Sequence, residues 1–213
     1  MPAKTDREYR NLANIQADEA DYIVTGQFTT YDSPYMLYSF DEPEARYEVW
    51  EIVDRNAFDE CDVSDVIMQY DHEGRVFARN TNETLALDFN IPLMTAMLGG
   101  TEIGRQLHEE IKGGYTTKMS FGFKVADSIR TEEIIENEGQ KPIVKVTRTI
   151  KKISKLYDVS AVSLPANDQT SISARALGEG VIEEARKEFM EARTLEIQRA
   201  KAIARAKSIS MEE

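Results

Sequence analysis

The 213-residue sequence has very few of the residues that form disulfides or bind metals. Cys61 is the only cysteine, which excludes an internal disulfide and a zinc site built from several cysteines. His72 and His108 are the only histidines, so we expect no structural or catalytic metal and no cofactor. The chemistry of an active site would then rest on ordinary polar side chains.

Long hydrophobic runs are also absent from the sequence. No segment approaches the length of a membrane span, and the polar N-terminus lacks the apolar core of a signal peptide. We therefore expect a protein of cytosolic origin that does not bind membranes. Basic residues are outnumbered as well, with 26 Lys and Arg against 38 Asp and Glu and a formal charge of −12. Because Lys and Arg make most phosphate contacts, this balance argues against nucleic acid and favours basic proteins as partners.

The middle of the chain is rich in β-branched and aromatic residues, which favour strands. Residues 1–21, in contrast, are polar and indicate a flexible arm or a short helix. One helix is expected within residues 91–113, with Thr101 as its N-cap and Gly113 at its end. The predicted strands are 22–31, 46–53, 65–70, 76–78, 84–89, one around Ser120, a hairpin of 125–136 with 142–153, and 156–164.

The C-terminal part of the sequence has a different composition. Residues 181–207 are rich in Ala, Glu, Arg and Lys and contain no Gly or Pro, so they predict a long helix. The expected organisation is an N-terminal arm (1–21), a β-rich domain (22–177) and a helical tail (178–213). The tail could pack as a terminal helix, bind a partner or be removed, and the sequence does not choose among these.

The stretch Lys118-Met119-Ser120-Phe121-Gly122-Phe123-Lys124 has the alternation of a strand. Phe121 and Phe123 would face one side and Ser120 the other. A glycine two residues after the serine leaves room on the serine's face for another backbone or a substrate. That arrangement suits a nucleophile, although these seven residues taken alone fit an ordinary edge strand with an exposed serine better.

Four stretches taken together resemble the tailed-phage prohead maturation serine proteases, which are relatives of the herpesvirus capsid protease. They are His72 in a turn after a strand, Gly104-Arg105 opening a helix, MSFGF at 119–123, and LYDVSAVSLPAN at 156–167. The resemblance covers residues from about 22 to 175. It implies a catalytic triad of His72, Ser120 and Asp158. It also implies an α+β fold, a mostly antiparallel β-barrel surrounded by helices, here with a long C-terminal helix.

The chemistry of these three residues agrees with that resemblance. A serine hydroxyl needs a base to take its proton, and histidine suits the task because its pKa lies near neutrality. A carboxylate such as Asp158 would hold the imidazole in the right tautomer. The resemblance further implies an endopeptidase that acts in the assembling procapsid. Its substrates would be the scaffold protein or the scaffold-like segment of the major capsid protein, and its own termini.

Other residues could take these roles. His108 is a rival third member, since the herpesvirus enzyme uses a second histidine there, although the following Glu109 and Glu110 favour a polar helix face for it. Ser160 and Ser163 are rival nucleophiles, of which Ser160 faces the same side as Asp158 but lacks a relieving glycine. Lys118 or Lys155 would allow a Ser-Lys dyad, whereas Cys61 lies in an acidic setting that disfavours a thiolate.

Several features remain open in the sequence. The loop at residues 165–167 could supply an oxyanion hole, and the herpesvirus enzymes suggest a homodimer. The competing function is a non-enzymatic capsid assembly or scaffolding protein with an inactive protease-like body. The two functions differ in one geometric respect: catalysis requires His72 Nε2 within hydrogen-bond distance of Ser120 Oγ.

Overall fold

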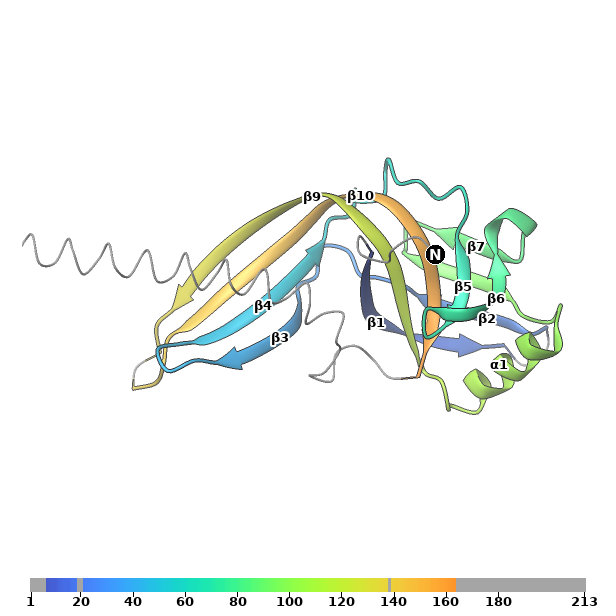
Figure 1. Cartoon of the computed structure of the whole chain (residues 1–213), viewed down its shortest axis with the longest axis horizontal. Helices are drawn as coiled ribbons and strands as arrows, with labels where there is room; N and C mark the ends of the chain where they lie inside the picture. The colour runs from blue at the N-terminus through green and yellow to red at the C-terminus, as the bar shows by residue number, and fades with distance from the viewer. Residues whose placement is uncertain (1–6, 19–20, 138, 164–213) are drawn as a thin grey trace, which may run out of the picture. The chain divides into compact units, whose positions relative to one another are not determined.

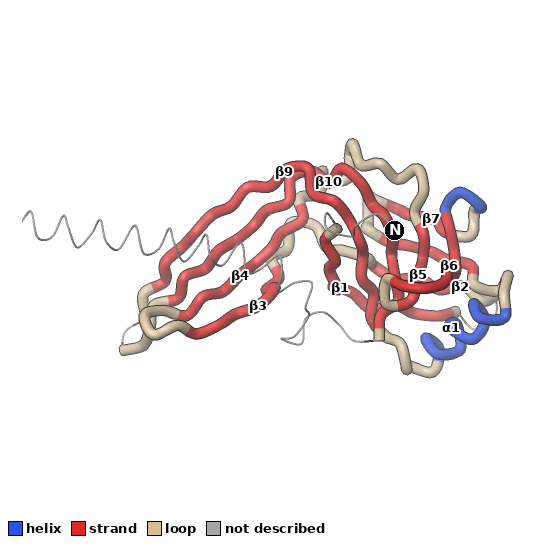
Figure 2. Tube along the Cα trace, viewed as in Figure 1, coloured by secondary structure: helices blue, strands red, loops and turns tan. Residues whose placement is uncertain are grey.

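The computed structural model describes residues 7–18, 21–137 and 139–163, and these are mostly β-strands (Figures 1 and 2). The strands are β1 (Glu8–Ala17), β2 (Ile23–Gln27), β3 (Tyr35–Asp41), β4 (Arg46–Val53), β5 (Ile67–Tyr70), β6 (Glu73–Arg79), β7 (Leu85–Asp88), β8 (Leu93–Met97), β9 (Lys118–Ile135) and β10 (Ile143–Val162). A short 3₁₀ turn, η1 (Asn80–Asn82), and one α-helix, α1 (Glu102–Lys112), complete the elements of this part. No helix within it is both long and apolar enough to cross a bilayer.

The predicted fold class was wrong. The strands are hydrogen-bonded in the order β3-β4-β10-β9-β1-β2-β8-β7, with β5 on β10 and β6 on β5, and they do not close into a barrel. A barrel surrounded by helices is also excluded because the described residues contain one α-helix. The long helix expected at 181–207 lies outside the described residues.

The two longest strands, β9 and β10, form the antiparallel pair that organises the fold (Figure 1). The sequence predicted this pairing but divided each arm into shorter strands. The edge of β10 that faces away from β9 pairs in parallel first with β4 and then, at residues 158–161, with β5. The first residues of β9 pair on their other side with β1. The strands β5, β10, β9 and β1 therefore lie side by side around Ser120 and Asp158.

Two local predictions failed in the N-terminal half of the chain. Residues 8–17 form β1 instead of an arm or a short helix, and residues 93–97 form β8 instead of the start of a helix. The helix itself begins and ends as predicted. Its N-cap Thr101 accepts a hydrogen bond from the Gly104 amide at 3.0 Å, and Gly113 is its C-cap.

Aromatic side chains fill the core between the sheet segments. The rings of Phe121 and Phe123 are stacked with centroids 4.5 Å apart, and both are fully buried. Phe28 and Phe58 pack against Phe121 with centroid distances of 6.2 and 6.4 Å. Such buried rings each remove a large apolar area from water, so they hold β9 in place rigidly. Ser120 is attached to this strand.

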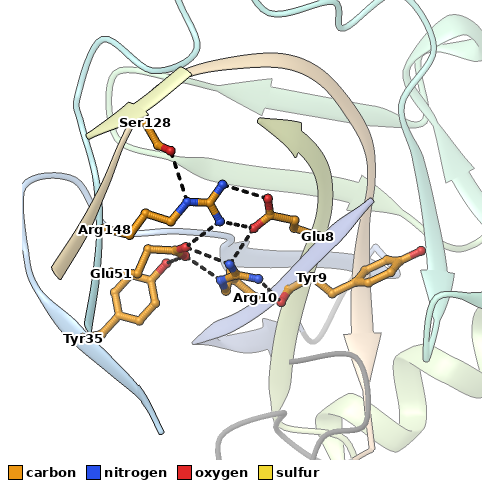
Figure 3. A network of polar contacts seen from close by, with 7 residues as sticks. All are labelled: Glu8, Tyr9, Arg10, Tyr35, Glu51, Ser128 and Arg148. Atoms are coloured by element: carbon orange, nitrogen blue, oxygen red, sulfur yellow. Dashed lines mark hydrogen bonds and ion pairs between the residues drawn. The ribbon is translucent and has the colours of Figure 1, made fainter. Parts of the chain in front are cut away.

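A buried network of ion pairs ties β1 to β4 and β10 (Figure 3). Arg10 donates from Nε and Nη2 to the Glu51 carboxylate at 2.5 and 2.7 Å, and Tyr35 donates to the same carboxylate at 2.5 Å. Glu8 accepts from Arg10 at 2.7 Å and from Arg148 at 2.7 and 3.0 Å. Each buried charge thus has an opposite partner with good geometry, as burial requires.

The Glu8 carboxyl makes the stability of this network depend on pH. Burial alone would raise the pKa of Glu8, but the Arg148 hydrogen bond and the charges of Arg10 and Arg148 together lower it below 4.5. The stability contributed by the ionised group is therefore present above about pH 4.5 and is lost as the pH falls through the lowered pKa. We expect the melting temperature to fall less steeply with acid in Glu8→Gln than in the parent chain. Equal slopes in both chains would contradict this linkage.

Candidate active site

His72 lies at the tip of a two-residue hairpin between β5 and β6. Tyr70 and Glu73 are paired, and the two residues between them, Asp71 and His72, have φ of 49° and 58°. Positive φ at both positions is the pattern of a type I′ turn, which matches the twist of the flanking strands. Asp and His are among the few residues with a side chain that tolerate this conformation. The predicted turn is thus present, and it places His72 at the tip of the β5–β6 hairpin, beside β10.

The end of β10 holds this turn. Asp71 accepts hydrogen bonds from the Ser163 amide and hydroxyl, both at 2.8 Å, and its own amide donates to the Ala161 carbonyl at 2.9 Å. Ser163, a rival nucleophile in the sequence, therefore donates its hydroxyl to a carboxylate. The turn that carries His72 is fastened to the strand that carries Asp158.

The three residues that the sequence grouped together meet at this point. His72 Nε2 lies 2.6 Å from Ser120 Oγ, and His72 Nδ1 lies 2.5 Å from Asp158 Oδ1. Ser120 and Asp158 are buried in adjacent strands, whereas the His72 side chain is 14% exposed. Since a carboxylate cannot donate, Nδ1 carries the proton and donates a hydrogen bond to Asp158. Nε2 then carries the lone pair that accepts a hydrogen bond from the Ser120 hydroxyl.

Gly122 makes room for the carboxylate. A Cβ built on Gly122 would lie 2.3 Å from Asp158 Oδ2 and 2.8 Å from Tyr9 Cε1. The sequence predicted that this glycine leaves space for a backbone or a substrate. The space instead holds the Asp158 side chain and the edge of the Tyr9 ring, because Gly122 is the residue of β9 paired with both Asp158 and Tyr9.

Tyr9 is a residue of the site that sequence reasoning missed. Its ring packs on the His72 ring with centroids 4.2 Å apart. Figure 3 shows the Tyr9 ring pointing away from the ion-pair network that its neighbours Glu8 and Arg10 form. Burial, followed by the charge of Asp158, raises the pKa of the Tyr9 phenol, which therefore stays neutral at physiological pH. Charged and aromatic residues alternate in Glu8-Tyr9-Arg10, and this alternation is the sequence signal from which a strand could have been recognised here.

We expect Tyr9→Ala to lower the rate of peptide cleavage by about tenfold, because an unsupported His72 ring can turn away from Ser120. Tyr9→Phe keeps the ring and should cleave within about twofold of the parent rate. Steady-state assays of the two variants, with thermal unfolding as a control for folding, measure the difference. Equal rates for Tyr9→Ala and the parent chain would show that the ring does not support His72.

The rival residues lie in other settings. His108 is 2% exposed, donates from Nε2 to the Asp18 carbonyl at 2.7 Å, and packs edge-on against Tyr22. The sequence favoured a polar helix face for His108, but its side chain is buried. Lys155 forms an ion pair with Asp62.

Cys61 remains a poor thiolate, because burial raises the pKa of its thiol to about 11. The acidic surroundings noted in the sequence add to this shift through Asp62, but the loss of solvent is the larger cause.

A serine hydroxyl beside one imidazole nitrogen, with a buried carboxylate at the other, is the arrangement of the serine hydrolases. Residues 13–183 of this chain match the family of the Caudovirus prohead serine protease. The match covers most of the sequence, so the chain belongs to that family and is a serine peptidase of phage capsid maturation. It acts in the assembling procapsid on a capsid or scaffold protein. No match was found among curated proteins or solved structures.

Family membership decides between the two functions that the sequence left open. A non-enzymatic scaffolding protein was the alternative, and the family is one of serine peptidases. The relation to the herpesvirus enzyme stays a prediction. So do the boundaries of the arm, domain and tail, of which residues 178–213 lie outside the described part of the chain.

Proposed function

We propose that Ser120, His72 and Asp158 are the nucleophile, the general base and the orienting acid of this peptidase. The observation that carries the proposal is the unbroken line of contacts from Ser120 Oγ through the imidazole to Asp158 Oδ1. A serine hydroxyl is a weak nucleophile until a neighbouring base takes its proton. With Nδ1 donating to Asp158, Nε2 offers the lone pair that this step needs.

The cleavage then follows two proton-balanced steps. Ser120 Oγ bonds to the carbonyl carbon of the scissile peptide while its proton moves to His72 Nε2. The carbon–nitrogen bond breaks, and the leaving amine takes that proton. A water molecule next gives a proton to Nε2 and attacks the acyl ester. Ser120 recovers a proton as the new carboxyl end leaves.

A substrate, or a small reagent that modifies the serine, must uncover the nucleophile as it binds, because the Ser120 side chain is fully buried. The carbonyl oxygen also needs donors as its charge develops, and a lost donor typically costs about 10²–10³ in rate. The loop at 165–167, which the sequence suggested for this role, lies outside the described residues.

The substrates we propose are the scaffold protein, or a scaffold-like segment of the major capsid protein, and the termini of the chain itself. The support is the family, whose members act on prohead proteins. The net charge of −12 further favours cleavage segments that are neutral or basic, because like charges repel an acidic peptide.

Cleavage would begin in the host cytoplasm, where proheads assemble. A homodimer is also proposed from the resemblance and would be tested by sedimentation of the purified chain.

Co-expression with each prohead protein of the same virus tests these substrates. The chain is produced with the scaffold protein or with the capsid protein, and mass spectrometry records every new N-terminus. We expect cleavage products of at least one of them with the parent chain and intact proteins with Ser120→Ala. Intact prohead proteins in both cases would reject the proposed substrates. Masses of the protease itself in the same samples report self-processing.

A further inference from the structure

A second serine lies in the site, on the neighbouring strand and directly opposite the first. Ser160 of β10 is paired with Ser120 of β9, and both side chains are fully buried. The Ser160 hydroxyl donates to Asp158 Oδ1 at 2.6 Å. That oxygen is the one that His72 Nδ1 also contacts. Residues 158 and 160 share a face of β10, as the strand alternation predicted.

Ser160 supplies half of the hydrogen bonds that the structure gives to the Asp158 carboxylate. Both of its donors, His72 and Ser160, bind Oδ1, whereas Oδ2 has no hydrogen-bond partner among the described residues. A carboxylate that is 1% exposed must be stabilised by donors, since it cannot draw on water. A hydrogen bond to a charged buried group is also stronger than one between neutral groups.

The Ser160 hydroxyl also fixes the direction of the carboxylate. Rotation about the last bond of an aspartate is soft and roughly two-fold, so one hydrogen bond from the imidazole defines it poorly. A second donor on a rigid strand holds Oδ1 toward His72 and leaves Oδ2 in the space beside Gly122. The proton of Ser160 points at a carboxylate, whereas Ser120 is the serine in contact with the imidazole.

We propose that Ser160 is a positioning residue of the catalytic reaction, which acts by holding Asp158 Oδ1 against His72 Nδ1. This inference rests on the proposed roles of Ser120, His72 and Asp158. Ser160 forms no bond to the substrate and transfers no proton in the reaction. Its effect is therefore on the rate of acylation and not on the binding of a substrate.

The rate at which diisopropyl fluorophosphate modifies Ser120 tests this role, because the small reagent reports activation of the serine. We expect Ser160→Ala to lower the maximal rate of modification by about tenfold, because the variant loses one hydrogen bond to a buried charge. The half-saturating concentration of the reagent should stay within about twofold of the parent value. Ser154→Ala is the matched control. Ser154 lies on the same strand and donates to the Lys124 carbonyl at 3.2 Å, so its loss should leave the rate unchanged.

A double-mutant cycle separates positioning from a general structural effect. If Ser160 acts through Asp158, adding Ser160→Ala to Asp158→Asn should lower the rate less than about twofold further. A full tenfold loss in the Asp158→Asn chain, or a parent rate in Ser160→Ala alone, would overturn the inference. Ser160→Cys, which keeps nearly the same volume with a weak donor, carries the same test if the alanine variant does not fold. Absence of any reaction at Ser120 in the parent chain would instead reject the proposed function.

Discussion

Ser120→Ala should lower the rate of prohead-protein cleavage by about 10⁴–10⁶-fold while the chain remains folded. The variant loses the atom that bonds to the substrate, which is the hydroxyl oxygen 2.6 Å from Nε2 of His72. The change removes one oxygen from a fully buried side chain, and the residue stays compatible with β9. Folding should therefore change little.

The measurement is a time course of substrate conversion, followed by mass spectrometry with equal amounts of folded protein. Circular dichroism and thermal unfolding of the two chains control for structure. Ser154→Ala serves as a control for the loss of a serine hydroxyl elsewhere on the β9–β10 pair. Cleavage at the parent rate in Ser120→Ala would reject this serine as the nucleophile.

Gly122→Ala should lower the same rate by about 10²–10⁴-fold, although Gly122 itself takes no part in the chemistry. The added methyl group would lie 2.3 Å from Asp158 Oδ2, well inside van der Waals contact. Asp158 is buried and must move, which withdraws Oδ1 from His72 Nδ1. Loss of an orienting acid costs up to about 10⁴ in serine proteases, because the histidine is no longer held in the required tautomer.

Gly100→Ala provides the matched control for this substitution. A Cβ at Gly100 meets no atom within 4 Å, and its φ is not positive. The same glycine-to-alanine change there should leave the cleavage rate unchanged. A Gly122→Ala chain with the parent rate would show that the carboxylate position does not limit catalysis.

The candidate site was predictable because its parts carry local signals. His72 follows a buried strand and lies in a charged turn, and Ser120 lies in an alternating strand with aromatic neighbours. Neither signal specifies how far apart the two residues are in space. The resemblance to a known family supplied that link in the sequence, and the contact of 2.6 Å supplies it in the structure.

The sheet was less predictable because its pairing is non-local. β10 receives both β4 and β5 in parallel along one edge, at different positions along its length. Local alternation shows that a segment is a strand, but it does not say which strand lies beside it. The barrel came from the family resemblance alone, and the hydrogen-bonded order of the strands contradicts it.

The sequence did not predict strand β1 because one face of the strand buries charged residues. The other face carries Tyr9 into the site. Glu8 and Arg10 are typical surface residues, yet they are buried here in ion pairs with Arg148 and Glu51. A hydrophobic pattern cannot reveal a strand whose buried face is charged. The same alternation places Tyr9 on the other face, against His72.

The most direct test of the central claim is to locate the adduct of diisopropyl fluorophosphate by mass spectrometry of tryptic peptides. Cleavage after Lys118 and Lys124 releases residues 119–124, in which Ser120 is the only serine, whereas Ser160 and Ser163 belong to the peptide 156–175. We expect the adduct on the 119–124 peptide of the parent chain and its loss in His72→Ala. An adduct on the 156–175 peptide, or equal modification of Ser120 with and without His72, would contradict the account.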